Sequence, residues 1–163
     1  MITSLSIENF ALIEKLSVQF SDGFSTITGE TGAGKSILLG ALGLVLGKRA
    51  DSSTLKDASK KCIIEARFSI SNYNLNAFFE EKDLDFDQET IIRREILPSG
   101  KSRAFINDTP TTIQTLQLLS EKLIDVHSQH QTVQLSDGNF QFYIIDALAA
   151  NSAKIESYKR ELI

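Results

Sequence analysis

The chain has 163 residues, of which 42% are hydrophobic and 23% charged, and its formal net charge at pH 7 is −4. This length suffices for one domain with a hydrophobic core, and the composition excludes a disordered chain. Nucleic-acid-binding domains are typically basic, so the negative net charge gives no sign of one. No apolar run approaches the roughly 20 residues of a membrane span, and a single cysteine, Cys62, excludes an internal disulfide.

The first 28 residues predict three short strands. Apolar and polar residues alternate around Leu5 and Ile7 and again from Leu16 to Phe20, which predicts two strands that pair. A turn at 21–23 precedes a third strand, Phe24 to Thr28. The chain enters this pattern without a secretory signal, so we expect a cytoplasmic protein with no membrane contact.

A glycine-rich loop of the form G-x-x-x-x-G-K-[ST] follows the third predicted strand. After it, an apolar run to Leu46 predicts a buried helix, with Gly47 as its C-terminal cap. A strand before the loop and a helix after it are the context of a P-loop that binds the phosphates of a nucleoside triphosphate, here ATP. The predicted site comprises Gly29, Glu30, Thr31, Gly32, Ala33, Gly34, Lys35, Ser36 and the next residue, Ile37.

Each part of this loop has a physical role. The glycines let the backbone approach the phosphates, and the successive N–H groups of Thr31 to Ser36 form a concavity at the positive end of the helix dipole. Lys35 supplies a point charge for the β- and γ-phosphates, and the Ser36 hydroxyl is a ligand for Mg²⁺. A second GKS triplet, Gly100 to Ser102, lacks the earlier glycine and is expected to be a hairpin turn.

The middle of the chain predicts a second β-rich layer. A polar connector, Asp51 to Lys60, is followed by alternation from Cys62 to Ile70 and by a short helix, Leu75 to Lys82. Two further strands are expected to form a hairpin, a turn follows them, and helical spacing leads into one more short strand. These elements are Thr90 to Leu97, Ser102 to Ile106, the turn Asn107 to Pro110, a helix with Ile113, Leu116, Leu119 and Leu123, and the strand Leu123 to Val126.

The polar segment His127-Ser128-Gln129-His130-Gln131 comes directly after the last predicted strand, a common position for functional residues in α/β folds. Two histidines three residues apart raise the alternative of zinc, but a zinc site needs three or four ligands. The sharper hypothesis is that the amide of Gln129 bridges Mg²⁺ and the attacking water above the nucleotide.

Taken together, these motifs resemble the N-terminal half of the ATPase head of the SMC family, in particular its bacterial DNA-repair members. The resemblance covers essentially the whole chain. It rests on Ile7 to Glu14, on the P-loop Gly29 to Ser36, on Gly47 to Asp51, on Ser102 to Asn107, and on Asp125 to Gln131. The last segment is similar to the family's Q-loop, in which glycine often stands where this chain has Ser128, and Gln129 stays in register.

The resemblance implies an α/β, ABC-type head with a mixed sheet, a P-loop helix and an antiparallel β layer. Residues 1–138 are expected to form the N-terminal lobe, and 139–163 a helix that leads into a coiled coil. The Walker B acidic pair, the signature motif and the switch histidine of such heads do not occur in these residues, so we expect a fragment that does not turn over ATP alone. The implied partners are DNA, bound through local basic patches, the chain's own C-terminal half-head, and a second head in a homodimer of a nucleoid-associated bacterial protein.

Several alternatives stay open. Arg49 is either an arginine that approaches phosphates or the partner head, or a solvated charge; Asn9 and Phe10 lie either beside adenine or in a simple turn. Other classes are an SMC-like clamp that uses ATP mainly for association and an ABC transporter ATPase. An unfinished core with an exposed apolar face further predicts that the fragment dimerises.

Overall fold

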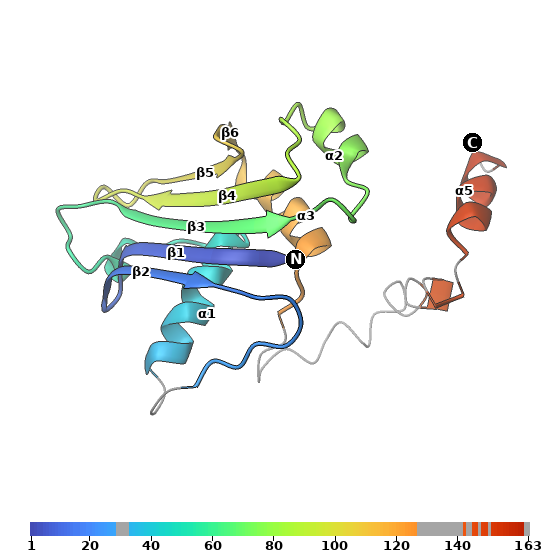
Figure 1. The fold of residues 1–163 in the computed structure, drawn as a ribbon. Coiled ribbons are helices and arrows are strands. Elements are labelled where there is room, and N and C mark those ends of the chain that lie inside the picture. Colours follow the sequence, from blue (N-terminus) through green and yellow to red (C-terminus); the bar gives the residue numbers. More distant parts are fainter. Residues whose placement is uncertain (29–32, 127–141, 143–144, 147, 150, 162–163) are drawn as a thin grey trace. The chain divides into compact units, whose positions relative to one another are not determined.

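Six strands form one antiparallel sheet in the order β2-β1-β3-β4-β5-β6 (Figure 1). Every strand pair in it is antiparallel, which confirms the expected antiparallel layer. Both strand pairs that the sequence predicts, the early pair and the central hairpin, are present. The strands are β1 (Ile2–Phe10), β2 (Ile13–Gln19), β3 (Cys62–Ser69), β4 (Glu89–Ile96), β5 (Ser102–Ile106) and β6 (Thr109–Thr111).

This computed structural model describes residues 1–28, 33–126, 142, 145–146, 148–149 and 151–161. Its contacts divide the chain into two units, Met1–Ile124 and Asp125–Ile163. The sheet and the predicted P-loop helix belong to the first unit. In the second unit, α5 (Ser152–Glu161) lies within the helix expected over 139–163, and the expected boundary at 138 falls outside the described residues. No helix in the described ranges is long and apolar enough to cross a membrane.

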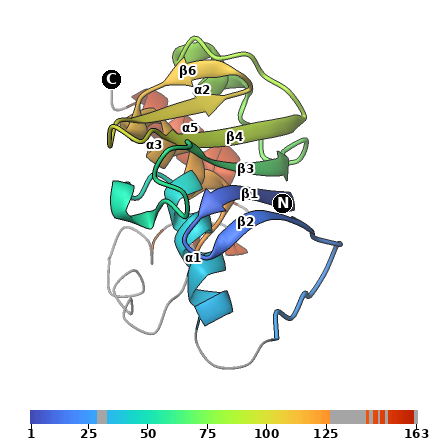
Figure 2. The same ribbon diagram turned by 90° about the vertical axis from the view of Figure 1, so that its left-hand side faces the viewer.

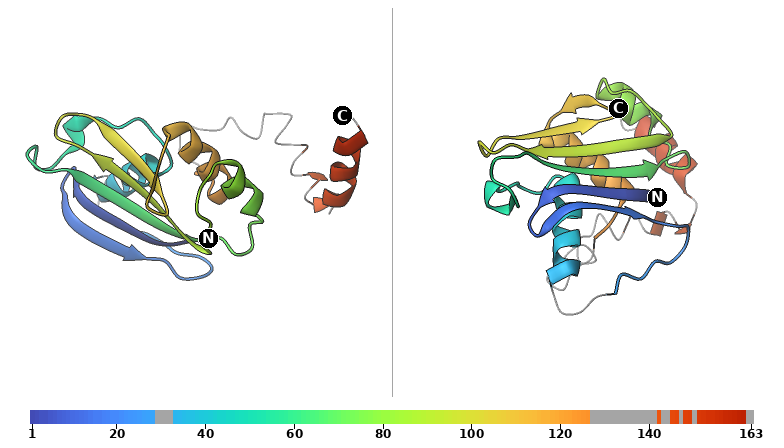
Figure 3. Two further views of the ribbon diagram at one scale, coloured as in Figure 1. Left: turned by 90° about the horizontal axis from the view of Figure 1, so that it is seen from above. Right: turned by 60° about the vertical axis from the view of Figure 1, so that its left-hand side comes forward.

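Two helices, α1 (Ala33–Val45) and α3 (Ile113–Leu123), cover one face of the sheet (Figures 1 and 3). A short helix, α2 (Asn76–Glu81), connects β3 to β4, and a 3-10 helix, Ser52–Thr54, follows α1. Strand alternation sends apolar side chains toward α1 and α3 and polar side chains to the other face. The core combines strand residues with helix residues, among them Ile7, Ile64, Ile92, Ala41, Val45, Leu116 and Leu119, all fully buried.

Two tight turns join the last three strands. Between β4 and β5, Gly100 has φ +79° and the Leu97 N–H donates to the Lys101 carbonyl at 2.8 Å, so the second GKS triplet is a hairpin turn, as predicted. Between β5 and β6, Asn107 and Asp108 both adopt positive φ, which two-residue hairpins require. The turn at Asn107 was expected, whereas β6 was not.

Two predicted strands are absent from the described residues. Phe24 to Thr28 forms an open loop (Figure 2), and Phe24 is 94% exposed. Leu123 is the last residue of α3, and Ile124 is extended with its N–H bonded back to the Ser120 carbonyl at 3.1 Å. Both predictions are wrong, because neither segment forms a strand within the described residues.

Candidate functional site

The described part of the predicted P-loop forms the first turn of α1. The helix begins at Ala33, so Gly34, Lys35 and Ser36 lie in this turn, and all three are exposed. The first N–H groups of a helix have no intrahelical acceptor, and the helix dipole adds partial positive charge there. This turn contains no acidic residue that would compete for those groups. The turn therefore fits an anionic group, to which Lys35 adds a full positive charge.

The exposed hydroxyl of Ser36 fits Mg²⁺, which prefers oxygen ligands and keeps several waters. The side chain of Ile37, by contrast, packs half-buried against the core. In the described part of the chain no three His, Cys, Asp or Glu side chains group as metal ligands, so Ser36 is the described residue that suits the ion. The backbone of Gly29, Glu30, Thr31 and Gly32, and the side chain of Ala33, lie outside the described residues.

The C-terminus of α1 closes as its sequence predicts. Gly47 has φ +90°, its N–H donates to the Leu44 carbonyl at 3.1 Å, and the Lys48 N–H donates to the Gly43 carbonyl at 2.9 Å. This pair of bonds is a Schellman motif, which satisfies carbonyls that a helix end leaves open. Helix α1 is thus fixed at Gly47 while its first turn stays exposed.

One side of α1 faces an apolar groove of about 310 Å³. Leu38, Leu39 and Leu42 of α1 line it together with Val18, Phe20 and Ile27, and Lys35 lies at its edge. The prediction of a helix buried nearly all round holds for Ala41, Leu44 and Val45, whereas Leu39 is 52% exposed. Within the part of the chain that the structure describes, the helix that carries the P-loop residues therefore presents an apolar side that is left partly exposed.

The second part of the predicted site, His127 to Gln131, lies outside the described residues. The assignment of Gln129 to Mg²⁺ and the attacking water stays a prediction. So does the zinc alternative for His127 and His130.

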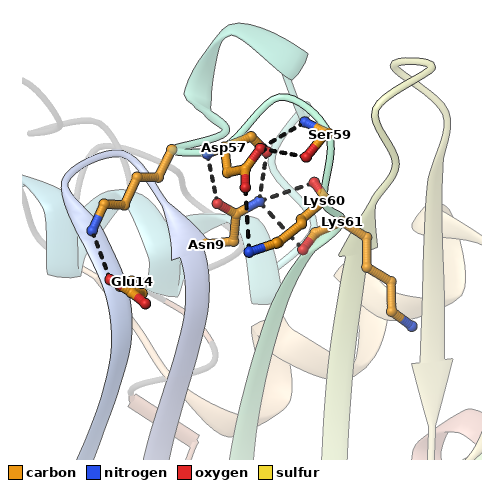
Figure 4. Close-up of polar contacts among 7 residues, drawn as sticks. Asn9, Glu14, Asp57, Ser59, Lys60 and Lys61 are labelled. Carbon is orange, nitrogen blue, oxygen red and sulfur yellow. Dashed lines mark hydrogen bonds and ion pairs between the residues drawn. The ribbon is translucent and has the colours of Figure 1, made fainter.

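Asn9 has a structural role that the sequence did not reveal (Figure 4). Its Oδ1 accepts from the backbone N–H of Asp57 at 2.7 Å, and its Nδ2 donates to the carbonyls of Asp57 at 3.0 Å and Lys60 at 2.9 Å. Its φ of 54° lies in the left-handed region that Asn tolerates. Asn9 lies near the end of β1, so its amide ties this end of the strand to the loop before β3, and the adenine and turn alternatives both stay predictions.

Phe10 is buried, at 5% exposure, and its ring lies against α1 at Gly40. This contact makes Phe10 part of the core beneath the P-loop helix. Arg49 is exposed just after the Schellman motif, and both of its alternatives remain open.

The two consecutive arginines of β4, Arg93 and Arg94, are not simply solvated surface charges. Arg94 is 1% exposed and faces the core side of β4, where its Nη2 donates to Ser102 Oγ at 3.2 Å and burial lowers the pKa of the guanidinium. Arg93 pairs with Asp108 at 2.9 Å and lies 4.6 Å from the centre of the Phe105 ring. Arg94 is therefore unavailable as a surface charge, because the even-numbered residues of β4 point inward.

Comparison with protein families places nearly the whole chain in one family. Residues 1–159 match the family described as the RecF/RecN/SMC N terminal domain. The chain is 41% identical over 153 residues to the DNA repair protein RecN of Vibrio cholerae, covering 93% of this chain and 28% of that protein. It is 37% identical over 155 residues to RecN of Haemophilus influenzae, with the same coverage of 93% and 28%. The chain thus spans under a third of the length of these curated relatives.

A solved structure has the same fold. It comes from work titled "Structural biochemistry of ATP-driven dimerization and DNA stimulated activation of SMC ATPases", and it aligns with a TM-score of 0.62 at 22% identity. The alignment covers 90% of this chain and 98% of the solved chain. At this identity the likeness shows the fold, which is that of an ABC-type, SMC-like ATPase head.

Proposed function

This chain belongs to the RecF/RecN/SMC N terminal domain family, and from that premise we propose that it is the ATP-binding N-terminal part of the head of a RecN-like DNA-repair ATPase. The observation that carries the proposal is the first turn of α1, where Gly34, Lys35 and Ser36 are exposed and no acidic residue competes. The DNA-repair role is taken from relatives that are up to 41% identical to this chain.

In this proposal the N–H groups from Thr31 to Ser36 hold the triphosphate, and the Lys35 ammonium contacts its β- and γ-phosphates. The Ser36 hydroxyl and the Gln129 amide hold Mg²⁺, which when bound neutralises charge on the phosphate oxygens. Gln129 also orients the attacking water. Ile37 anchors the first turn of α1 to the core, as its half-buried contacts support.

The chain supplies, on this account, half of a working head. Its sequence contains no Walker B acidic pair and no signature motif, and phosphoryl transfer needs acidic groups for the metal and the water. The uncovered apolar groove beside α1 supports a further layer from the rest of a longer polypeptide. A second head in a homodimer would present its signature motif to this P-loop. The 163 residues alone are therefore proposed not to turn over ATP, with 139–163 leading into a coiled coil.

DNA is the proposed partner of the complete protein, in recombinational repair in the bacterial cytoplasm. The net charge of −4 restricts the contact to local positive charge. Arg103 suits this role because it is exposed and has no ion pair among the described residues.

The test is ATP hydrolysis by a full-length polypeptide that contains this chain, measured with and without DNA. We expect hydrolysis that DNA stimulates and that Lys35→Ala abolishes, while Lys101→Ala, in the second GKS triplet, leaves the DNA-free rate unchanged. If DNA raises only the dimer fraction, the clamp alternative holds. Hydrolysis unaffected by Lys35→Ala would refute the proposed site.

A further inference from the structure

Arg94 is a buried cation without an anionic partner. Its side chain is 1% exposed and points to the core side of β4, where its neighbours on the adjacent strands are Ile64 and Ala104. Among the described residues its Nε and Nη1 atoms have no hydrogen-bond partner, and no carboxylate pairs with the guanidinium. A buried charge is costly unless it is paired and hydrogen-bonded, so this guanidinium lacks a group that would compensate it.

One hydrogen bond leads from Arg94 to the surface. Its Nη2 donates to Ser102 Oγ at 3.2 Å. Ser102 is exposed at the start of β5, directly after the tight turn of the β4–β5 hairpin. The hydroxyl of Ser102 therefore connects a position that solvent can reach with the buried guanidinium.

Ser102 also borders an open hollow of about 510 Å³ beside β5 and β6. Thr112 and Ile113, the N-cap and the first residue of α3, line this hollow, and so does Arg103. A helix N-terminus carries partial positive charge, and Arg103 is exposed with no ion pair among the described residues. The hollow thus offers room and positive surroundings for a phosphate group attached to Ser102.

A free anion and a covalently attached phosphate would reach different atoms here. Arg94 is 1% exposed and does not line the hollow, so a dissolved anion would meet Ser102 but not the guanidinium. A phosphate bonded to Ser102 Oγ, by contrast, starts from the atom to which Arg94 Nη2 already donates. Its oxygens can accept from Nη2 and from the unpartnered Nη1, in the charge-assisted pairing that arginine forms with phosphate.

We propose that Ser102 is an O-phosphorylation site whose phosphate pairs with Arg94. The phosphoryl donor is ATP held by a serine kinase: Ser102 Oγ bonds to the γ-phosphorus, its hydroxyl proton passes to the base of the kinase, and the bond to the β-phosphate oxygen breaks to release ADP. The modification replaces a neutral hydroxyl by a group of about −1.5 to −2 charges at pH 7, which gives the buried guanidinium its anion. It does not depend on nucleotide binding by the chain itself.

The first measurement asks whether the phosphate meets the guanidinium. The full-length polypeptide that contains this chain is made with phosphoserine in place of Ser102 or, as the matched control, in place of Ser99. Ser99 is exposed in the same hairpin and has no side-chain hydrogen bond among the described residues. Phosphorus-31 NMR then follows the second ionisation of each phosphate, which has an ordinary pKa of about 6.

We expect the phosphate on Ser102 to titrate about one pH unit below the phosphate on Ser99, because a neighbouring guanidinium favours the doubly charged form. Arg94→Gln should remove this difference, whereas Arg103→Gln should keep most of it. If Arg94→Gln does not fold, the Arg103→Gln background and the comparison of the two positions still decide the question. A phosphate that titrates alike at both positions, or one on Ser102 that unfolds the chain, would overturn the proposal.

The second measurement asks whether the modification is made in the cell. The full-length protein is isolated from the organism that encodes it, grown with and without DNA damage, and is analysed by mass spectrometry after digestion with a protease that spares Lys101 and Arg103. We expect phosphate on Ser102 and none on Ser99. An unmodified Ser102 under both growth conditions would overturn the proposal.

Discussion

Asn9 and Asp57 hold each other through two hydrogen bonds, in which Asn9 Oδ1 accepts from the Asp57 N–H at 2.7 Å and Asn9 Nδ2 donates to the Asp57 carbonyl at 3.0 Å. A third bond, to the Lys60 carbonyl at 2.9 Å, extends the same contact. The end of β1 and the loop before β3 are thus joined by hydrogen bonds. Phe10, the next residue along the chain, packs its ring against α1 at Gly40.

We expect Asn9→Ala to lower the free energy of unfolding by about 2–4 kcal/mol, because it removes all four side-chain hydrogen bonds of Asn9, including a longer one to the Lys61 carbonyl, and places Ala at positive φ. Asn74→Ala is the matched control, since Asn74 also has positive φ, 52°, but no side-chain hydrogen bond among the described residues. Asn74→Ala should lower the free energy of unfolding by about 1 kcal/mol, which is the cost of placing Ala at positive φ without any loss of hydrogen bonds. Equal losses in urea unfolding would contradict the role given to the Asn9 amide.

Gly47 and Gln117 should behave as a coupled pair. Gly47→Ala is expected to cost more than the roughly 1–2 kcal/mol of a left-handed alanine, because the new Cβ overlaps Gln117 Cγ. In a Gln117→Ala background that overlap disappears, so Gly47→Ala should then lower the free energy of unfolding only by the cost of a left-handed alanine. A double-mutant cycle of unfolding free energies measures the difference. Additive losses would mean that a Cβ introduced at position 47 does not meet the Gln117 side chain.

The apolar side of α1 should drive association of the 163-residue chain. Leu39 is 52% exposed beside the groove, and exposed apolar surface of this kind favours self-contact. By light scattering we expect a concentration-dependent mass above that of the monomer, which Leu39→Lys reduces. Leu118→Lys, on α3 away from the groove lining and 39% exposed, should leave the mass unchanged. A sharp wild-type monomer at all concentrations would refute this expectation.

Cys62 should make stability fall at high pH. Burial raises the pKa of the Cys62 thiol from its ordinary 9.0 to about 11. The folded state therefore keeps a proton that the unfolded state loses, so the thiol's contribution is complete below pH 9.0 and is lost as the pH rises through about 11. Between these values wild type should lose about 1.4 kcal/mol per pH unit relative to Cys62→Ala. Parallel pH profiles of the two proteins would contradict the buried thiol.

The sequence predicted the helices and strands that short-range residue patterns determine. Strand patterns located β1 to β5 but not the three-residue β6, because burial of one face imposes a period of two that needs a longer strand to show. Gly47 predicted the end of α1, since only its conformational freedom suits the left-handed cap. The first turn of α1 carries the P-loop residues for a similar reason, as the motif is continuous in sequence.

What could not be predicted depends on residues distant in sequence. The strand propensity of Phe24 to Thr28 is real, but pairing requires a partner that the described residues do not supply. The amide of Asn9 bonds a loop 48 positions away, and Arg94 is buried because its strand alternation, not its charge, sets its direction. The Asn9 contact leaves no local signal, whereas the alternation that buries Arg94 is itself local.

The central claim is that the first turn of α1 binds the phosphates of ATP. The most direct measurement is the ATP affinity of a full-length polypeptide containing this chain, by titration calorimetry, for wild type, Lys35→Ala and Lys101→Ala. Because both lysines stand in a GKS triplet but only Lys35 lies in the first turn of a helix, we expect Lys35→Ala to weaken ATP binding about tenfold or more and Lys101→Ala to leave it unchanged. Equal affinities for wild type and Lys35→Ala would contradict the account.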